Sequence, residues 1–431
     1  MITNKYIFFL ILLLINLCFM SCDTQQNQNL PTGVWRADLT SDAGVSIPFN
    51  FEVVELSQNQ QNIYLLNGEE RLLIDDIVYT DKSVTIPMHV FDSEIIAQYD
   101  AKNKVLKGQW IKHSYGKEYK MPFEAEPNQK HRFEKTETKS SLKEEITGKW
   151  EVTFADDTVN AIGLFEQKGD KVTGTFLTVT GDYRFLEGTM NGNEMNLSCF
   201  DGAHAFLFKA KMKEDGSLLG DFWSGRTYHT SWTAKKNEKY ELPSPNSLTF
   251  LKKGYDKIEF AFPDLNGDTL RWDDAKYKGK VLVLQIFGTW CPNCLDETVF
   301  YTSFYDKKTS DEFEILGLAY EATEDFEVAS KRVERMKKRL GTKYDFAIAG
   351  VSKKIDAAKS LPMLNHIMSF PTSIFIDKWG NVRRIHTGFT GPGTGKYYEE
   401  FVEDFELFVN KLINEKSPPK NKDTEDTASE T

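Results

Sequence analysis

Cysteine is scarce in this sequence of 431 residues, which contains a single close pair. The pair is Cys291 and Cys294, in the stretch FGTWCPNCLDE, and the other cysteines are Cys18, Cys22 and Cys199. One local pair does not make a disulfide scaffold, which needs several bridges. A structural zinc site needs four ligands, and neither a second C-x-x-C nor an H-x-x-x-H motif accompanies the pair. The low cysteine content therefore disfavours both a disulfide scaffold and a zinc site.

An excess of basic residues is also lacking. The chain has 53 Lys and Arg residues against 64 Asp and Glu residues, which gives a formal net charge of -11. Proteins that bind nucleic acid usually concentrate Lys and Arg on one face, so we expect no nucleic-acid partner. The 40% hydrophobic content excludes a disordered chain. The length predicts two or three domains of roughly 100 to 200 residues.

A long apolar run lies at the N-terminus, where Lys5 precedes residues 6–17. This layout predicts a secretory signal, because the run is shorter than the about 20 residues of a membrane span. The letters FMSC resemble a bacterial lipobox, with Phe19 where Leu is usual. The resemblance implies cleavage before Cys22 and a lipid on Cys22, whereas the alternative is an uncleaved N-terminal anchor. Either way, we expect the chain at the periplasmic face of a bacterial membrane, inner or outer.

Short runs of alternating apolar and polar residues fill the sequence from Gly33 to about Lys236. Asn191-Gly192 and Asp215-Gly216, which separate such runs, are strong signals for hairpin turns. A weak repeat divides the region, since GVW and GKW open two blocks and GQW and GDFW come near their ends. The pattern predicts two antiparallel β-rich units, packed as sandwiches or small barrels.

The aromatic residues of these units, with His204 and His229, allow either a binding site or an ordinary core. Aromatic residues at strand spacing usually form core, and histidines far apart in the sequence are usually exposed or satisfied, so we favour core. Cys199 lies in an alternating segment and is expected to be a buried small hydrophobe rather than a reactive thiol.

The periodicity changes after about residue 255. The apolar run KVLVLQIF predicts a buried strand, and the residues after the cysteines predict an amphipathic helix. A strand, a helix, a hairpin and a closing helix follow, and this alternation predicts a central sheet covered by helices.

The C-x-x-C motif falls where the buried strand meets the helix. Cys291 would then lie at an exposed helix N-terminus, where unpaired N–H groups and the helix dipole stabilise a thiolate. Pro292 suits the first helical position, since its missing N–H needs no partner there. We therefore expect Cys291 to be the attacking sulfur and Cys294 to resolve the mixed disulfide.

The stretch VLVLQIFGTWCPNC, the stretch FPTSIFIDKWGNV about 80 residues later, and the closing helix together resemble the thioredoxin fold. The hairpin FPDLNGDTLRW and Glu297 in C-x-x-C-x-x-E make this part similar to the membrane-anchored TlpA/ResA thiol-disulfide oxidoreductases. The β-rich front half also looks like the N-terminal portion of lipid-anchored members of that family.

This resemblance implies roles for four further residues. Pro371 would be cis and lie beside the cysteines, Phe370 would pair with an extended client peptide, and Trp290 would cover the thiols. Glu297 would donate and accept protons during exchange. Without the resemblance, a solvated helix charge would be the preferred interpretation of Glu297. One departure concerns Gln285, which stands where many thioredoxins have a buried aspartate and cannot carry a proton.

The predicted organisation is a multidomain chain with two antiparallel β-rich units followed by an α/β thioredoxin-like domain. The expected segments are a signal peptide with lipobox at 1–22, β-rich units at 30–128 and 146–236, the thioredoxin-like domain at 255–415, and a disordered tail at 416–431. Polar or proline-containing linkers are expected at 129–145 and 235–247.

The predicted function is thiol-disulfide exchange, with reduction of disulfides in exported clients favoured by the family resemblance. No bound cofactor and no metal are expected, but repeated turnover as a reductase implies a membrane electron donor. A thiol peroxidase is one alternative, although Leu284 and Gly288 replace the Pro and Ser or Thr of its usual motif. The other alternative is a client- or ligand-binding lipoprotein whose thiol pair has a sensory role.

Overall fold

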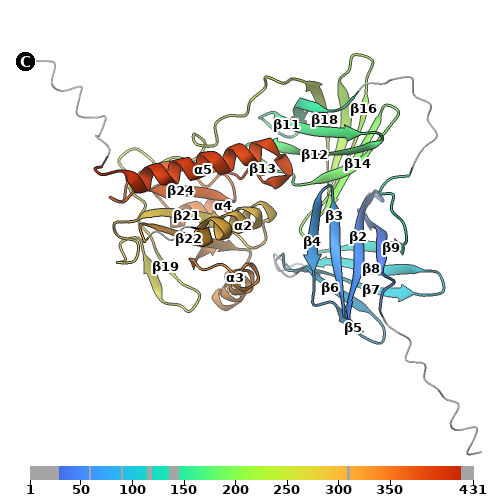
Figure 1. Ribbon diagram of the computed structural model, residues 1–431, viewed down its shortest axis with the longest axis horizontal. Coiled ribbons are helices and arrows are strands. Elements are labelled where there is room, and N and C mark those ends of the chain that lie inside the picture. Colours follow the sequence, from blue (N-terminus) through green and yellow to red (C-terminus); the bar gives the residue numbers. More distant parts are fainter. Residues whose placement is uncertain are drawn as a thin grey trace, which may run out of the picture.

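The computed structural model describes residues 29–418, except 58–59, 89–90, 114–118, 135–144 and 308–310. The predicted signal peptide and Cys22 lie outside the described residues, as do the last 13 residues of the predicted tail, 419–431. The described residues form three bodies, two built on nine-stranded sheets and one on a five-stranded sheet (Figure 1).

The first body is a single antiparallel meander. Consecutive strands pair except β4 and β5, which are the two ends of the sheet, and β9 returns to pair with β1, in the order β4-β3-β2-β1-β9-β8-β7-β6-β5. β4 contacts β6, so the two ends of the sheet approach each other and the sheet curls into an open barrel. The strands are β1 (Gly33–Thr40), β2 (Ser46–Ser57), β3 (Gln60–Asn67), β4 (Glu70–Ile74), β5 (Val78–Tyr79), β6 (Val84–Met88), β7 (Ser93–Asp100), β8 (Val105–Lys112) and β9 (Tyr119–Pro127).

The second body has the same meander but closes completely. β10 pairs with both β11 and β18, and β11 also pairs with β12, so the sheet has no free edge among its long strands. Closure removes the unpaired N–H and C=O groups that an edge strand exposes. The strands are β10 (Gly148–Phe154), β11 (Ala161–Lys168), β12 (Lys171–Thr178), β13 (Gly181–Asp182), β14 (Leu186–Asn191), β15 (Glu194–Phe200), β16 (Ala205–Met212), β17 (Leu218–Ser224) and β18 (Tyr228–Lys236).

The sequence repeat has a common geometry in the two barrels. Trp35 in β1 and Trp150 in β10 are both buried, and each indole Nε1 donates to the carbonyl four residues earlier, at 2.9 and 2.8 Å. Trp110 and Trp223 both lie in the penultimate strand of their barrel, β8 and β17. The two units therefore share this local geometry, and the second is a closed barrel as one of the two predicted alternatives has it.

The third body has a five-stranded sheet in the order β23-β22-β21-β24-β25. β21 is parallel to β22, and β22 to β23, whereas β24 and β25 are antiparallel. The strands are β21 (Val281–Phe287), β22 (Phe313–Glu321), β23 (Asp345–Val351), β24 (Thr372–Ile376) and β25 (Val382–Thr387), and a separate hairpin pairs β19 (Ala261–Pro263) with β20 (Thr269–Arg271). The helices are α2 (Pro292–Lys307), α3 (Phe326–Leu340), α4 (Lys354–Ser360), α5 (Lys396–Asn414) and the 3₁₀ turn η2 (Pro392–Thr394).

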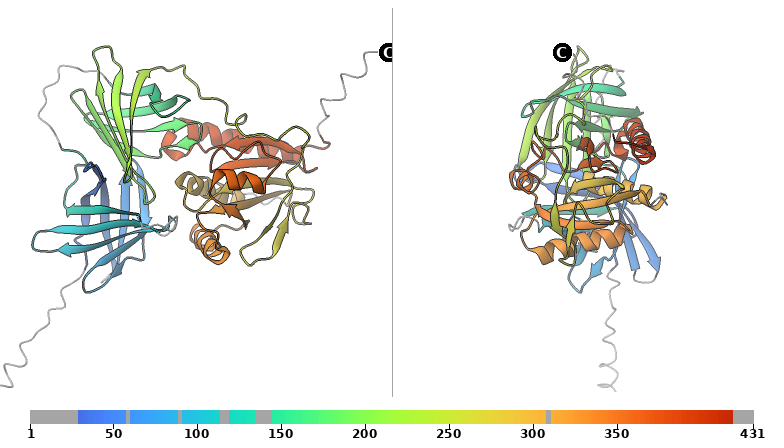
Figure 2. Two further views of the ribbon diagram at one scale, coloured as in Figure 1. Left: turned by 180° about the vertical axis from the view of Figure 1, so that it is seen from behind. Right: turned by 90° about the vertical axis from the view of Figure 1, so that its left-hand side faces the viewer.

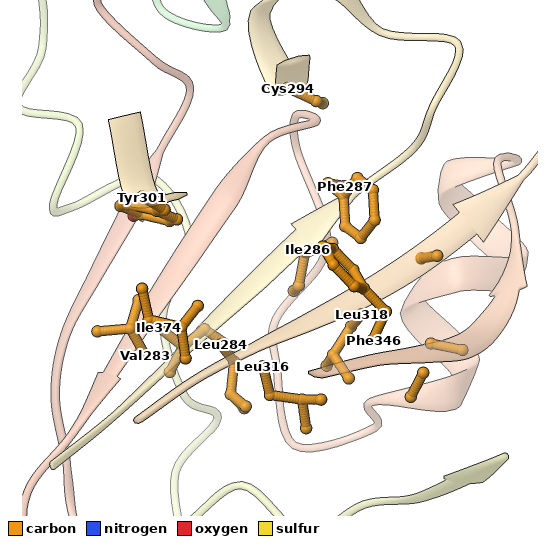
Figure 3. Close-up of a cluster of buried hydrophobic side chains, with 14 of the residues drawn as sticks. Val283, Leu284, Ile286, Phe287, Cys294, Tyr301, Leu316, Leu318, Phe346 and Ile374 are labelled. Carbon is orange, nitrogen blue, oxygen red and sulfur yellow. The ribbon is translucent and has the colours of Figure 1, made fainter. Parts of the chain in front are cut away.

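The central strand β21 organises the core of this thioredoxin-like body. All seven of its residues are buried, as expected for a strand covered on both faces. Figure 3 shows its side chains among those of the neighbouring strands and of α2, where the labelled residues are Val283, Leu284, Ile286, Phe287, Cys294, Tyr301, Leu316, Leu318, Phe346 and Ile374.

Local signals explain where α3 begins and ends. The Asp325 side chain accepts from the backbone N–H of Val328, and Gly341 adopts the left-handed conformation that ends the helix.

Among the residues that the structure describes, no helix has the length and apolar character of a membrane span.

Side-chain bonds join the three bodies, and the C-terminal body lies beside both barrels (Figure 2). Arg184, between β13 and β14, is 3% exposed and bonds Glu70 of the first barrel and Asp296 of α2, both at 2.5 Å. On α3, Arg332 pairs with Asp92 of the first barrel, and Arg339 pairs with Asp75 at 2.6 Å.

The predicted linker at residues 235–247 is bound at both ends rather than free. Tyr240 Oη donates to the Asn160 carbonyl at 3.0 Å, and the Thr387 N–H donates to the Pro245 carbonyl at 3.0 Å. The segment therefore ties the second barrel to the C-terminal sheet. Its prolines had led us to expect that it would keep these two bodies apart.

Arg184→Met should strongly destabilise the protein. The change leaves the carboxylates of Glu70, Asp201 and Asp296 without their buried cation, and breaking a buried ion pair typically costs about 3–5 kcal/mol. Urea denaturation of the full chain measures the effect.

Arg226→Met is the matched control, because Arg226 also joins the two barrels through Asp42 but is 41% exposed. We expect little change for Arg226→Met. Equal, small effects of the two substitutions would show that the buried Arg184 cluster does not hold the bodies together.

Candidate active site

The two cysteines lie at the start of α2. β21 ends at Phe287 and α2 begins at Pro292, so Cys291 directly precedes the helix and Cys294 lies within its first turn. The two residues form a disulfide, and their Cα atoms are 5.2 Å apart. The backbone N–H of Cys294 donates to Cys291 Sγ at 3.2 Å. Such an N–H, together with the helix dipole, stabilises negative charge on Cys291 once the pair is reduced.

Cys291 is more enclosed than its position at a helix N-terminus led us to expect. It is 7% exposed, and Cys294 is fully buried. Cys291 Sγ lies 3.4 Å from the carbonyl oxygen of Phe370, and the ring of Trp290 packs edge-on against Phe370. Trp290, Cys291 and Phe370 line one cleft of about 660 Å³, whose other side is the second barrel. Access to the sulfur is therefore limited by a body that lies outside the thioredoxin-like fold.

The segment before β24 reaches the cysteines as the resemblance implies. The Phe370–Pro371 peptide bond is cis, and the Phe370 carbonyl faces Cys291 Sγ. The structure thus brings Trp290, Cys291, Phe370 and Pro371 to one place. Cys22 lies outside the described residues, so its lipidation stays a prediction.

Glu297 is fully buried in α2, which excludes a solvated helix charge. Its carboxylate accepts from Gln285 Nε2 at 3.0 Å and from Ser373 Oγ at 3.0 Å, and the Tyr301 hydroxyl is 3.3 Å away. Burial raises the pKa of Glu297 to about 8, and these hydrogen bonds offset only part of that effect. Glu297 is therefore a carboxyl that can hold a proton near neutral pH.

Gln285, in β21, bonds to two side chains of α2, and Glu297 is one of them. Its Nε2 also lies 3.1 Å from Thr298 Oγ1, which donates to the Cys294 carbonyl at 2.8 Å. The amide fills the place of the usual aspartate and donates a hydrogen bond to Glu297. The sequence identified Gln285 as a departure but did not reveal this contact, because residues 12 apart meet only through the packing of β21 against α2.

Glu321 is a structural contributor that the sequence analysis missed. It is fully buried at the end of β22, and its carboxylate accepts from the backbone N–H and from the hydroxyl of Thr289, both at 2.8 Å. Burial raises the pKa of Glu321. The loop before Cys291 is held by these bonds and by Trp290 Nε1, which donates to the Tyr320 carbonyl at 2.9 Å. The sequence did contain a signal for this role, which is a glutamate at the end of an apolar strand.

The remaining candidates have ordinary structural roles. Cys199 is fully buried, as predicted, and burial raises its thiol pKa well above the usual range. His204 Nδ1 lies 3.2 Å from Asp201, and His229 Nε2 lies 2.9 Å from Asp221. Among the described residues, no three His, Cys, Asp or Glu side chains are grouped as metal ligands.

Comparison of this sequence with known proteins shows which family the C-terminal body resembles. Residues 253–400, which include both cysteines and Pro371, match the Redoxin family model. The thiol-disulfide oxidoreductase ResA of Halalkalibacterium halodurans is 26% identical over 152 residues, which cover 35% of this chain and 76% of that protein. The C-terminal body is a TlpA/ResA-like thiol-disulfide oxidoreductase domain.

Two other relatives are similar to this chain over segments of comparable length. A thiol-disulfide oxidoreductase ResA of Bacillus cereus is 31% identical over 129 residues, which cover 30% of this chain and 66% of that protein. The thioredoxin-like protein YneN of Bacillus subtilis is 23% identical over 138 residues, which cover 32% of this chain and 73% of that protein. The Redoxin match begins after the two barrels, so it assigns them no activity.

Glu297→Gln should change how stability depends on pH. The pKa of Glu297 is about 8 in the folded protein against a usual value of 4.5. At pH values between these two, the carboxyl group is protonated in the folded state and ionised in the unfolded state. Wild-type stability should therefore fall as pH rises from about 4.5 to about 8, by up to about 1.4 kcal/mol per pH unit.

The glutamine cannot titrate, so the variant should lack this part of the pH dependence. Urea unfolding at several pH values between 5 and 8 measures it, with Glu406→Gln as the control because Glu406 is an exposed residue of α5. Parallel pH profiles for wild type and Glu297→Gln would contradict the raised pKa.

Proposed function

We propose that this chain reduces disulfides of exported client proteins through Cys291 and Cys294. The observation that carries the proposal is the position of Cys291 Sγ, which receives the Cys294 N–H and lies 3.4 Å from the Phe370 carbonyl. The first contact favours a thiolate, and the second places the sulfur beside a backbone group that an extended client can pair with.

The proposed reaction begins with the reduced pair. The Cys291 thiolate attacks one sulfur of a client disulfide, the client S–S bond breaks, and the second client sulfur leaves as a thiolate that takes up a proton. Cys294, as a thiolate, then attacks Cys291 Sγ and releases the first client sulfur. Two electrons pass from the pair to the client, and the pair becomes the disulfide that the structure contains.

Glu297 is proposed as the proton acceptor and donor of this exchange. It lies one helical turn after Cys294, and its pKa of about 8 lets it change protonation near neutral pH. Gln285 cannot carry a proton, so it is proposed to position Glu297 by its hydrogen bond.

Trp290, Phe370 and Pro371 are proposed to form the client groove. The Trp290 ring is half-buried beside Phe370, and both residues line the cleft that contains Cys291. An extended client segment would pair with the backbone at Phe370 and bring its disulfide to Cys291.

Lipidation of Cys22 would hold the protein at the periplasmic face of a membrane. In that oxidising compartment the pair would not be reduced spontaneously, so the proposal includes a membrane electron donor. The relatives named ResA support thiol-disulfide exchange as the chemistry but do not specify the client.

Cys294→Ser should trap a mixed disulfide between Cys291 and a client, because the resolving thiol is absent. Mass spectrometry of the full chain after reaction with a disulfide peptide detects the adduct. Cys291→Ser is the control and should form none. An adduct on Cys294 in the Cys291→Ser protein, with none in Cys294→Ser, would reverse the assignment of the two sulfurs.

The reduction potential of the pair should lie below about -220 mV, in the range of reductases. Equilibration of the full-length protein with dithiothreitol and glutathione measures it, with Cys199→Ser as a control that should not change the value because Cys199 is buried. A potential near about -120 mV would identify an oxidant and reverse the proposed direction of electron flow.

A further inference from the structure

The cleft that contains Cys291 is shared by two bodies. Its volume is about 660 Å³, and the oxidoreductase domain supplies Trp290, Cys291 and Phe370 to its lining. The opposite lining comes from one end of the second barrel, at the ends of β12 and β17 and the starts of β16 and β18. We call this end, represented by Tyr183, Phe206, Phe222 and Tyr228, the barrel mouth. The Redoxin match does not cover these residues, since it begins at residue 253.

Hydrogen bonds fix the barrel against the oxidoreductase domain at this cleft. Ser369 Oγ donates to the Thr180 carbonyl at 2.7 Å, immediately before Phe370 in the sequence. Asn293 Nδ2, between the two cysteines, donates to the Asp182 carbonyl at 3.0 Å. The Gly391 N–H donates to the Asp182 carboxylate at 2.6 Å. The barrel is thus attached on both sides of Cys291.

Gly181 shows how close this approach is. Its φ of +136° is a conformation that favours glycine, and a Cβ on Gly181 would lie 2.3 Å from Asn293 Nδ2. Arg184, a few residues later, donates to the Pro292 carbonyl at 3.1 Å and pairs with Asp296. The barrel is therefore a fixed wall of the cleft and not a loosely attached neighbour.

The barrel mouth presents aromatic surface to the cleft. Phe206 and Phe222 are buried, with exposures of 7% and 3%, and their rings pack against each other. Tyr228 is 44% exposed, its ring packs edge-on against Phe222, and its hydroxyl donates to Asp156 at 3.3 Å. An exposed aromatic ring beside buried ones is suited to contact an apolar side chain.

The two walls suit an extended peptide between them. In an extended chain, successive side chains point to opposite faces. When a client cysteine points toward Cys291, the residues directly before and after it point away from the oxidoreductase domain, toward the barrel. Those flanking side chains are the ones that the barrel mouth can contact.

We propose that the barrel mouth is a specificity pocket for the exchange reaction, which takes an aromatic or large aliphatic side chain next to the client cysteine in an extended segment. This inference rests on the proposed disulfide exchange and adds its substrate class. The second barrel is then part of the client-binding site, and clients are unfolded or flexible at the reacting cysteine.

The test compares two short peptides that differ only in the residues on either side of a central cysteine, which are Phe in one and Ala in the other. Each cysteine carries mercaptoethanol as a mixed disulfide. The Cys291 thiolate attacks the peptide sulfur and mercaptoethanol leaves as a thiolate, then Cys294 displaces the peptide thiolate and the protein pair is oxidised. The reduced full-length protein in detergent is the enzyme, and chromatography measures the released peptide.

The Phe peptide should react with a second-order rate constant at least about tenfold higher, given the contribution of burying a Phe side chain. Equal rate constants for the two peptides, with normal exchange, would overturn the specificity pocket but leave the proposed function intact. Hydroxyethyl disulfide serves as a small reference substrate. Failure to react with it, as well as with both peptides, would overturn the proposed function and this inference with it.

Tyr228→Ala tests the pocket itself, and Tyr255→Ala is its matched control. The two tyrosines are similarly exposed, at 44% and 51%, but only Tyr228 lines the cleft. Tyr228→Ala should lower the Phe-to-Ala rate ratio severalfold, whereas Tyr255→Ala should leave that ratio unchanged. An unchanged ratio in Tyr228→Ala, or an equal fall in Tyr255→Ala, would overturn the assignment.

Discussion

Arg184 is a buried cation that links all three bodies of this protein. Its guanidinium is 3% exposed and is surrounded by the carboxylates of Glu70, Asp201 and Asp296, which belong to the first barrel, the second barrel and the oxidoreductase domain. A buried charge is costly unless it is paired, so loss of Arg184 would leave these carboxylates without their shared counter-charge. The exposed ion pairs between the bodies are screened by water and salt and contribute much less. One residue thus couples the positions of three bodies.

The same residue brings the second barrel into the active site. Arg184 donates to the Pro292 carbonyl, one residue after Cys291, and the adjoining turn with Gly181 contacts Asn293 between the cysteines. The reactive sulfur is 7% exposed, and the barrel lines the cleft that contains it. Enclosure raises the cost of exchange with a large folded partner, but it provides contacts for a peptide that fits. The barrel and the thiol chemistry therefore act on the same substrate.

The residue that we propose to handle protons lies on the interior side of α2. Glu297 and Gln285 form a buried pair behind Cys294, where burial raises the pKa of the carboxyl to about 8. A glutamine in this position avoids a second buried negative charge beside Glu297, which like-charge repulsion would disfavour. Glu321 has a different role, because both of its oxygens are bonded to Thr289 and hold the loop that precedes the cysteines. Two buried glutamates thus serve one site, one suited to protonation and one to positioning.

Local patterns in the sequence were sufficient to predict the β-rich repeat, the alternation of strand and helix, and the position of C-x-x-C at the start of α2. Hairpin dipeptides, the spacing of apolar residues and helix-capping residues each act on residues close by in the chain. They can therefore be recognised in the sequence directly. Closure of the second barrel, the burial of Glu297 and the role of Glu321 were decided only by tertiary structure. The contacts that produce them join residues 12 to 32 apart along the chain, or more. The Arg184 cluster shows this most strongly. A buried cation needs nearby carboxylates, and two of those that bond Arg184, on Glu70 and Asp296, are more than 100 residues away in the sequence.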